Sequence, residues 1–282
     1  MRPTWQSPDP PPVAPRLGPA GWLRLALRGV AVGGITFGGL ALMLLCRLVE
    51  RPLCGLNRPV TPWITVAVCR LVLRAMGLRL DLQGRPMRGR GAMVANHSSW
   101  LDIYVLNATG PLYFVSKSEV ARWPGIGWLA RATGTVFIDR DPRAAAAQKL
   151  TFEARLRAGH RLMFFPEGTS TDGLRVLPFK PTLFAAFFEH GLAEVLQVQP
   201  VSVRYQAPAG QDARALGWWG DMDFGSHLVT VLAAPRAGAV TVRFHAPIPV
   251  AGFAGRKPLA AACEAQVRAG HSAAGPTPRR DP

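Results

Sequence analysis

The chain has 282 residues, which suits one fairly large domain, or one domain with an anchor. Its formal net charge is +16, so an acidic partner is expected: an anionic membrane, a nucleic acid or a phosphorylated substrate. The sequence contains no zinc-finger spacing and no RNA-binding aromatic signature, which argues against nucleic acid. The four cysteines are scattered, and they predict reduced packing residues, not a disulfide framework or a metal cluster.

The N-terminal segment predicts a leader followed by a membrane anchor. Residues 1–20 include PDPPPVAPRLGP, and proline at this density predicts a disordered leader. The run from Gly29 to Cys46 has no charged residue, and as a helix it would span about 27 Å, close to the hydrocarbon thickness of a bilayer. A signal peptide would have a shorter apolar part, and a core helix would normally show a polar face, so membrane insertion is favoured.

A second apolar stretch, Val60 to Leu78, carries Arg70 and Arg74 on one face. It predicts an amphipathic helix on the membrane surface, with the arginines toward anionic headgroups. A hairpin of two half-embedded helices is the alternative, and residues 21–77 are the anchor region in either case. Arginines are more numerous after the uncharged run than before it, which favours the inner (cytoplasmic) membrane with the following domain facing the cytoplasm.

Residues 78–268 alternate between short apolar runs and helical segments, which predicts an α/β domain with helices on the faces of a sheet. In such sheets ligands bind beyond the carboxyl ends of the strands. Residues 269–282 are predicted to be a disordered tail. The expected strands lie in residues 78–84, 91–97, 112–117, 134–140, 160–168 and 196–205, and the expected helices in residues 118–133, 141–159 and 181–191.

The segment VANHSSWLDIYVL places His97 after a buried strand and Asp102 in the first turns of the next helix. The carboxylate could then fold back to the imidazole, fix its tautomer and leave the other ring nitrogen free to accept a proton. Alternatively, the residues from Ser99 to Asp102 form a capping box, and Asp102 merely caps the helix. This segment alone leaves both interpretations open.

Polar residues also follow two other predicted strands. Glu167, Gly168, Thr169 and Ser170 form a loop whose backbone N–H groups could hold an anionic headgroup, although an ordinary turn with an exposed glutamate is the alternative. Arg140 could form a bidentate contact with a phosphate or carboxylate, although an ion pair with a neighbouring aspartate is the alternative.

Two rival functions start from the same residues. His97, Asp102 and Glu167 could bind a metal ion for hydrolysis, but no second histidine lies nearby, so no metal is expected. A non-catalytic, basic, membrane-binding protein would use its arginines to recruit anionic lipid.

Four segments in order, NHSSWLD, GTVFIDRD, FFPEGTS and VQPVSV, resemble the four conserved blocks of the glycerolipid acyltransferase family, which includes bacterial 1-acyl-glycerol-3-phosphate acyltransferases. The resemblance covers roughly Leu78 to Pro249. It implies the fold of that family, a mixed sheet flanked by helices, here with an N-terminal membrane-anchoring helix or helical hairpin. It also implies that His97 is the general base on the acceptor hydroxyl and that Asp102 orients it.

The resemblance assigns roles to further residues. Arg140 and the loop from Glu167 to Ser170 would hold the acceptor headgroup, and Pro200 would shape the floor of the site. Backbone donors near Asn96 or Gly168 would stabilise the oxyanion of the tetrahedral state. The expected partners are a membrane, a lyso-lipid acceptor and an acyl-carrier-protein or acyl-CoA thioester as co-substrate, with no cofactor.

The expected reaction moves a fatty acyl group to the free hydroxyl of a lyso-lipid, with 1-acyl-glycerol-3-phosphate as the first candidate acceptor. No serine lies in a G-x-S-x-G elbow, so direct transfer in a ternary complex is favoured. Ser170 stands where lysophosphatidate-binding relatives commonly carry arginine. The surrounding sequence resembles the branch with lyso-ornithine lipid acyltransferases, which are the alternative. Arg175 or Lys180 could replace the missing charge, so both acceptors stay open.

Overall fold

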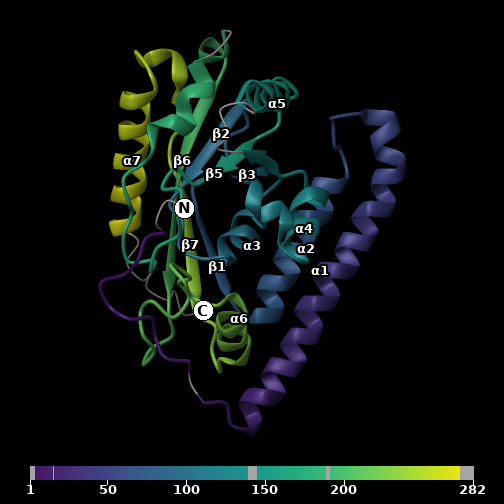
Figure 1. Cartoon of the computed structure of the whole chain (residues 1–282), viewed down its shortest axis with the longest axis vertical. Helices are drawn as coiled ribbons and strands as arrows, with labels where there is room; N and C mark the ends of the chain where they lie inside the picture. The colour runs from purple at the N-terminus through teal and green to yellow at the C-terminus, as the bar shows by residue number, and fades with distance from the viewer. Residues whose placement is uncertain (1–3, 15, 139–144, 189–190, 274–282) are drawn as a thin grey trace, which may run out of the picture.

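The computed structural model describes residues 4–14, 16–138, 145–188 and 191–273, and one eight-stranded sheet forms its centre (Figure 1). The strand order is β1-β7-β6-β2-β5-β3-β4, and β8 pairs with β6. Strands β7 and β8 run antiparallel to β6, whereas the other pairs are parallel, so the mixed sheet is confirmed. The strands are β1 Arg79–Gln83, β2 Gly91–Ala95, β3 Tyr113–Lys117, β4 Val136–Ile138, β5 Leu162–Phe164, β6 Gln197–Gln206, β7 Ala239–Phe244 and β8 Ile248–Pro249.

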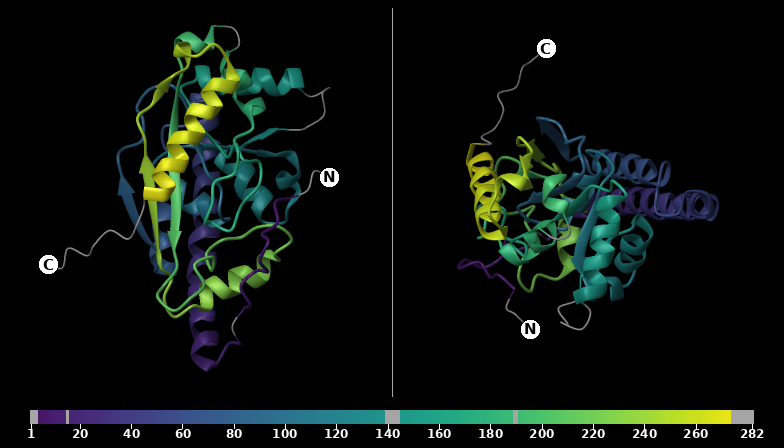
Figure 2. Two further views of the ribbon diagram at one scale, coloured as in Figure 1. Left: turned by 90° about the vertical axis from the view of Figure 1, so that its left-hand side faces the viewer. Right: turned by 90° about the horizontal axis from the view of Figure 1, so that it is seen from above.

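Helices cover both faces of the sheet (Figures 1 and 2). One face packs against α2, α3 and α6, and the other packs against α5, α7 and the 3₁₀ segment Pro181–Phe188. Two hydrophobic clusters result, one on each face, as expected for an α/β domain. The helices are α1 Pro19–Cys54, α2 Thr61–Met76, α3 Leu101–Asn107, α4 Ile126–Thr133, α5 Ala145–Arg157, α6 Phe224–Ala233 and α7 Arg256–Ala273.

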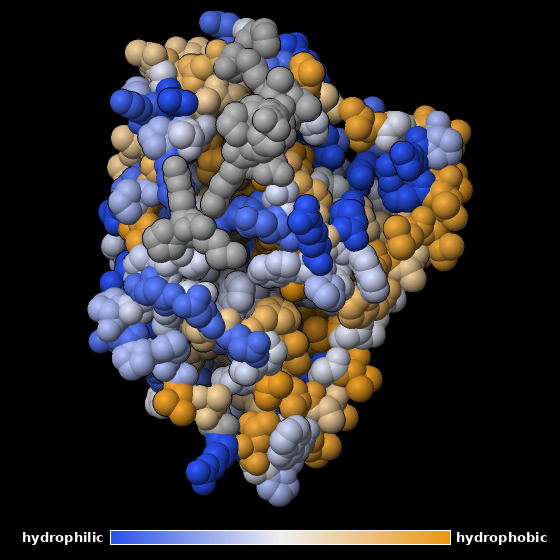
Figure 3. All heavy atoms as spheres, in the orientation of Figure 1, coloured by the Kyte–Doolittle hydropathy of each residue, from blue (hydrophilic) through white to orange (hydrophobic). Residues whose placement is uncertain are grey.

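The expected anchor is helix α1, which extends well beyond the uncharged run that predicted it. Among the described residues, α1 is the one helix that is long and apolar enough to cross a membrane. Its apolar side chains are largely exposed, and they form the orange strip along the right-hand edge of Figure 3, where Figure 1 places α1. A surface without protein contacts and with this composition is suited to lipid.

Helix α2 differs from the expected surface helix because one of its faces belongs to the core. Val72, Leu73 and Met76 are buried against the sheet. The helix also packs closely along α1: a Cβ at Gly39 would lie 2.2 Å from Val68 Cγ2, so only glycine allows this approach. The two helices therefore form a hairpin that is joined to the domain.

Several element boundaries differ from the sequence expectation. The helix expected over residues 118–133 is a 3₁₀ turn, Ser118–Arg122, followed by α4, because Pro124 interrupts the hydrogen-bond ladder and Gly125 has a φ of 70°. The segment from residue 181 is 3₁₀ rather than α-helical. The disordered tail expected from residue 269 is wrong at its start, because α7 continues to Ala273 and buries His271.

Candidate active site

The site begins with His97, directly after the fully buried strand β2. The imidazole stacks on Phe165, which follows β5, with ring centroids 4.0 Å apart and an interplanar angle of 12°. Strands β2 and β5 are parallel neighbours, so their carboxyl ends bring the two rings together. His97 keeps a side-chain exposure of 21%, so the ring is held in place and is still reachable from outside.

Asp102 lies in the first turn of α3, and its carboxylate is fully buried. Its Oδ2 lies 2.7 Å from His97 Nδ1 and accepts the backbone N–H groups of Ser98 at 2.8 Å and Ser99 at 3.1 Å. Both structural interpretations of this segment therefore apply, because the Asp102 carboxylate caps the turn before α3 and also orients the His97 ring. With Nδ1–H donating to the carboxylate, Nε2 is the nitrogen left to accept a proton.

Tyr205, which the sequence analysis missed, completes the environment of Asp102. Its phenol, on β6, donates to Asp102 Oδ1 at 2.7 Å. Burial and then the neighbouring Asp102 carboxylate raise the pKa of Tyr205 well above its usual range, so the phenol stays a donor. No local motif could have revealed this residue, because the sheet brings it to Asp102.

The loop that begins at Glu167 is fastened directly to the histidine loop. Thr171 N donates to His97 O at 2.9 Å, and Thr171 Oγ1 lies 3.2 Å from the same oxygen. Gly168 has a φ of 73°, and a Cβ there would lie 2.6 Å from Lys180 Nζ. Both constraints favour glycine at this position. The structure therefore brings the predicted loop next to His97.

Glu167 and Ser170 are less accessible than expected. Glu167 is 1% exposed, and among the described residues neither carboxylate oxygen has a partner in good hydrogen-bond geometry. Burial raises the pKa of Glu167 well above its usual range, although the nearby backbone amides of His97 and Leu177 oppose the shift. Ser170 is 6% exposed. The exposed turn considered for Glu167 is thus wrong, and the headgroup role of this loop stays a prediction.

The side chain of Asn96 has a structural role, and the oxyanion role expected of backbone donors near it stays a prediction. It is fully buried, and its amide is engaged with Val203: Nδ2 donates to the carbonyl and Oδ1 accepts the N–H, both at 2.8 Å. The side chain therefore braces β2 against β6. Pro200 is also buried, in β6 opposite Val94, so it lies within the sheet beneath the histidine loop. Its role in shaping the site floor stays a prediction.

The two cations considered as replacements for a missing arginine are both near the loop. Arg175 makes two hydrogen bonds to the buried Asp172 carboxylate, at 3.2 and 2.9 Å, which neutralises much of its charge. Lys180 lies against Gly168, as the close approach above shows. Arg140, the third predicted headgroup contact, lies outside the described residues.

The N-terminal leader contacts the site. Among the described residues, 4–14 contain no helix or strand, but Trp5 N donates to Thr169 Oγ1 at 3.3 Å and Gln6 Nε2 donates to Asp221 at 2.7 Å. The guanidinium of Arg175 lies 5.2 Å from the Trp5 ring centroid. The expectation of a wholly disordered leader is therefore wrong. The prolines prevent helix and strand formation in this segment, but they do not prevent Trp5 from packing against the domain.

Within the described part of the chain, no group of three or more histidine, cysteine, aspartate or glutamate side chains is placed to hold a metal ion. The geometry at His97 and Asp102 suits proton transfer by an oriented, partly exposed imidazole. Such a base suits a reaction in which a hydroxyl group must lose its proton as it attacks a carbonyl.

Comparison with known proteins identifies relatives of this chain. Residues 80–204 match the family model described as Acyltransferase. The chain is 60% identical to the lyso-ornithine lipid O-acyltransferase of Rhodobacter capsulatus, over 95% of this chain and 97% of that protein. It is 38% identical to the 1-acyl-sn-glycerol-3-phosphate acyltransferase of Neisseria meningitidis, over 50% of this chain and 55% of that protein.

The fold has a counterpart among solved structures. The crystal structure of the 1-acyl-sn-glycerophosphate acyltransferase PlsC from Thermotoga maritima matches 89% of this chain and 95% of its own, with a TM-score of 0.64 and 21% identity. At this identity the match concerns the fold alone, and the relatives above carry the family assignment. The chain therefore belongs to the acyltransferase family of enzymes.

Proposed function

We propose that this enzyme transfers a fatty acyl group from a thioester to the free hydroxyl of a lyso-ornithine lipid. The observation that carries the proposal is the 60% identity, across nearly the whole of both chains, to a relative named as a lyso-ornithine lipid O-acyltransferase. Relatives with the same name from Brucella abortus and Pseudomonas aeruginosa, at 41% and 36% identity, support the same acceptor.

The geometry of His97 supports a direct acyl transfer. Its Nε2 takes the proton of the acceptor hydroxyl as the oxygen attacks the thioester carbonyl, and Asp102 stabilises the imidazolium that forms. The tetrahedral intermediate then collapses with cleavage of the carbon–sulfur bond. The departing thiolate takes the proton from His97, which leaves an ester, a free thiol and the neutral histidine. The thioester of acyl carrier protein or coenzyme A supplies the acyl group, and no cofactor takes part.

The loop at Ser170 supports an acceptor without a phosphomonoester. A phosphomonoester carries up to two negative charges, and Arg fits it better than any other side chain. Here a serine takes that place, and Arg175 is already paired with Asp172. An ornithine headgroup carries an ammonium and a carboxylate, so it demands less cationic charge from the loop.

Lysophosphatidate is the second candidate acceptor. The similarity to the Neisseria 1-acyl-sn-glycerol-3-phosphate acyltransferase and the strongly basic composition support it. The enzyme would act on the inner membrane with α1 as its anchor and with the catalytic domain facing the cytoplasm. The exposed apolar surface of α1 and the arginines that follow it support this placement.

The test is an acyl-transfer assay with the purified full chain in nonionic detergent. Lyso-ornithine lipid and lysophosphatidate are offered separately and in competition, each with acyl carrier protein and coenzyme A thioesters. We expect kcat/KM to be higher for lyso-ornithine lipid. A higher value for lysophosphatidate would reject the proposed acceptor, and no transfer to either lipid would reject the proposed function.

A further inference from the structure

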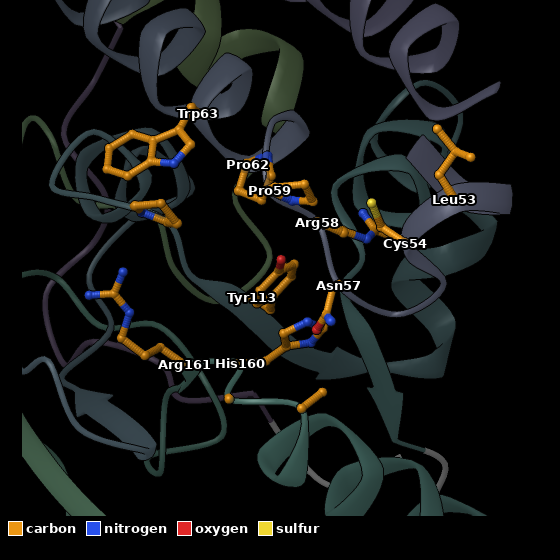
Figure 4. A pocket seen from close by; sticks show the side chains of 13 residues that line it. Leu53, Cys54, Asn57, Arg58, Pro59, Pro62, Trp63, Tyr113, His160 and Arg161 are labelled. Atoms are coloured by element: carbon orange, nitrogen blue, oxygen red, sulfur yellow. The ribbon is translucent and has the colours of Figure 1, made fainter. Parts of the chain in front are cut away.

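A pocket lies where strands β3 and β5 begin, at the opposite end of the parallel strands from His97, and Figure 4 shows the side chains that line it. It has a volume of about 630 Å³. Tyr113, which lines it, is the first residue of β3 and pairs with Leu162 at the start of β5, whereas His97 follows the end of β2. Because these strands are parallel, the pocket and the histidine lie at opposite ends of them. The acyl-transfer chemistry therefore does not account for this pocket.

Three arginines gather around Tyr113. Arg58 and Arg161 line the pocket, and Arg155 lies with its guanidinium carbon 4.5 Å from the Tyr113 ring centroid. Among the described residues, each guanidinium makes one hydrogen bond to a backbone carbonyl, at 3.0 Å for Arg58, 3.2 Å for Arg161 and 2.8 Å for Arg155. Backbone carbonyls hold these groups in place without neutralising their charge.

The nearby Glu50 carboxylate offsets only part of this charge, because it is already paired with Arg47 at 2.9 Å. Glu50 accepts hydrogen bonds from Arg47, from the Thr61 hydroxyl and from the backbone N–H groups of Val60 and Thr61, so its oxygens are occupied. Burial and then the neighbouring Arg58 lower the pKa of Arg155 to about 10, which reflects cations held together at the edge of the protein interior. Such an arrangement attracts an anion.

His160 provides an independent sign of a missing ligand. It lines the pocket but is only 6% exposed, and it stacks on Tyr113 with ring centroids 4.4 Å apart. Among the described residues, neither of its ring nitrogens has a partner in good hydrogen-bond geometry, although the backbone of Leu56 lies close by. Burial, and then the neighbouring Arg155, lower the pKa of His160 to about 4, so the ring is neutral and keeps one N–H to donate. Figure 4 shows His160 beside Tyr113 and Asn57, within the group of side chains that line the pocket. A buried donor without a partner is costly, and an anion in the pocket would supply one.

The rim of the pocket indicates where the anion comes from. Leu53 and Trp63 line its outer side and are 77% and 58% exposed, and Leu56 and Val60 beside them are also exposed. Leu53 lies in the last turn of α1, Leu56 and Val60 lie between the helices, and Trp63 lies in the first turn of α2. The rim is therefore next to the lipid-suited surface of α1. The apolar rim could contact the acyl chains of a lipid, and the arginines deeper in the pocket could contact its anionic headgroup.

We propose that this pocket binds the phosphate of an anionic membrane phospholipid, with Arg58, Arg161 and His160 as the headgroup contacts. The acyl chains lie along Leu53, Leu56 and Trp63. The bound lipid is not the acceptor, because the pocket lies at the opposite end of the strands from His97. It fixes the α1–α2 turn to the membrane surface. The inference concerns binding and does not depend on the acceptor proposed above.

The test measures the thermal midpoint of the purified full chain in nonionic detergent as phosphatidylglycerol, phosphatidylcholine or inorganic phosphate is added. We expect saturable stabilisation by phosphatidylglycerol and little by the other two. Arg161→Gln should weaken the apparent affinity about tenfold or more, because a charge-assisted contact is lost. Arg256→Gln removes the same charge from an exposed position at the start of α7, outside the pocket, and it should leave the affinity unchanged.

Asn57→Trp is the second test variant, since it fills the pocket from an exposed turn position and keeps every charge. It should abolish the stabilisation by phosphatidylglycerol even if Arg161→Gln fails to fold. Three results would overturn the proposal: equal stabilisation by phosphatidylcholine, equal stabilisation by inorganic phosphate at the same concentration, or wild-type affinity in Asn57→Trp. The second result would identify a site for soluble phosphate instead.

Discussion

Tyr205 donates a hydrogen bond of 2.7 Å to the carboxylate that orients His97, although 103 residues separate it from Asp102 in the chain. The phenol, two backbone N–H groups and the imidazole together surround a carboxylate with no exposure to solvent. A buried charge with this many donors is fixed in position. Tyr205 therefore helps to position the His97 imidazole through Asp102.

Tyr205→Phe should lower kcat with little change in KM, because the carboxylate loses a donor and holds the imidazole less firmly. A buried acceptor left without its donor costs about 1–3 kcal/mol, so the thermal midpoint should also fall. Tyr104→Phe is the matched control: it removes a phenol that pairs with Thr36 at 3.2 Å and does not contact Asp102.

Steady-state kinetics and thermal melts are measured on both variants. A fall in kcat reports a loss of positioning at His97, and a fall in the thermal midpoint reports a loss of packing. The control should lose stability but not kcat. If the two variants lost activity equally, Tyr205 would have no specific role in positioning the acid–base pair.

His97→Ala should abolish acyl transfer and preserve the fold, since only the proton acceptor is removed. A positioned base contributes typically about 10²–10⁴-fold to the rate. Asp102→Asn should also lose much activity, because an amide favours the wrong imidazole tautomer. Turnover is measured with radiolabelled thioester, with circular dichroism as the check on folding. Near-normal turnover in His97→Ala would refute the mechanism.

Local patterns in the sequence predicted β1 to β6 and the contact between His97 and Asp102, since a strand end and a capping turn are formed by neighbouring residues, but they missed β7 and β8. They could not predict partners that the sheet brings together. Asn96 has the position of a substrate contact in the sequence, yet it is engaged with Val203 across the β2–β6 pair. Trp5 lies in a proline-rich leader, yet it reaches Thr169. Both outcomes depend on long-range packing.

Stability should fall as the pH is lowered from about 6.5 toward 4, and His227 is one cause. Burial lowers its pKa to about 4, from an ordinary value of about 6.5. Over that interval the unfolded chain binds a proton that the folded chain does not, so the free energy of unfolding decreases with falling pH.

His227→Gln should therefore reduce the pH dependence of the thermal midpoint. The glutamine can still accept the bond that Trp100 Nε1 makes to His227 at 2.9 Å. Melts are compared between pH 7.5 and 5 in buffers without phosphate. Identical slopes in wild type and variant would show that His227 does not contribute.

The exposed apolar face of α1 should be required for membrane association. Leu27 and Leu45 are each 63% exposed on this face. The double change Leu27→Glu/Leu45→Glu places charges where lipid is expected and should move much of the protein to the soluble fraction. Leu150→Glu, at a position 65% exposed on α5, is the control and should not. Sedimentation of membrane extracts measures both. Unchanged sedimentation of the double variant would contradict the assignment of α1 as the anchor.

The last prediction concerns how Ser170 selects the acceptor. If its side chain faces the headgroup, Ser170→Arg supplies the cation that a phosphomonoester prefers. One charge-assisted contact is typically worth about 1.5–3 kcal/mol, or about tenfold to a hundredfold in affinity. The ratio of kcat/KM for lysophosphatidate to that for lyso-ornithine lipid should rise by up to this factor, mainly through KM.

Leu174→Arg is the matched control, because it adds the same charge to the same loop at an exposed position. Ser170 is 6% exposed, so a new arginine must extend either toward the acceptor or into the packing beneath the loop. A shift in the ratio without loss of stability means that it reaches the acceptor. A loss of stability with an unchanged ratio, or an equal shift in Leu174→Arg, would mean that Ser170 packs beneath the loop and that other residues choose the headgroup.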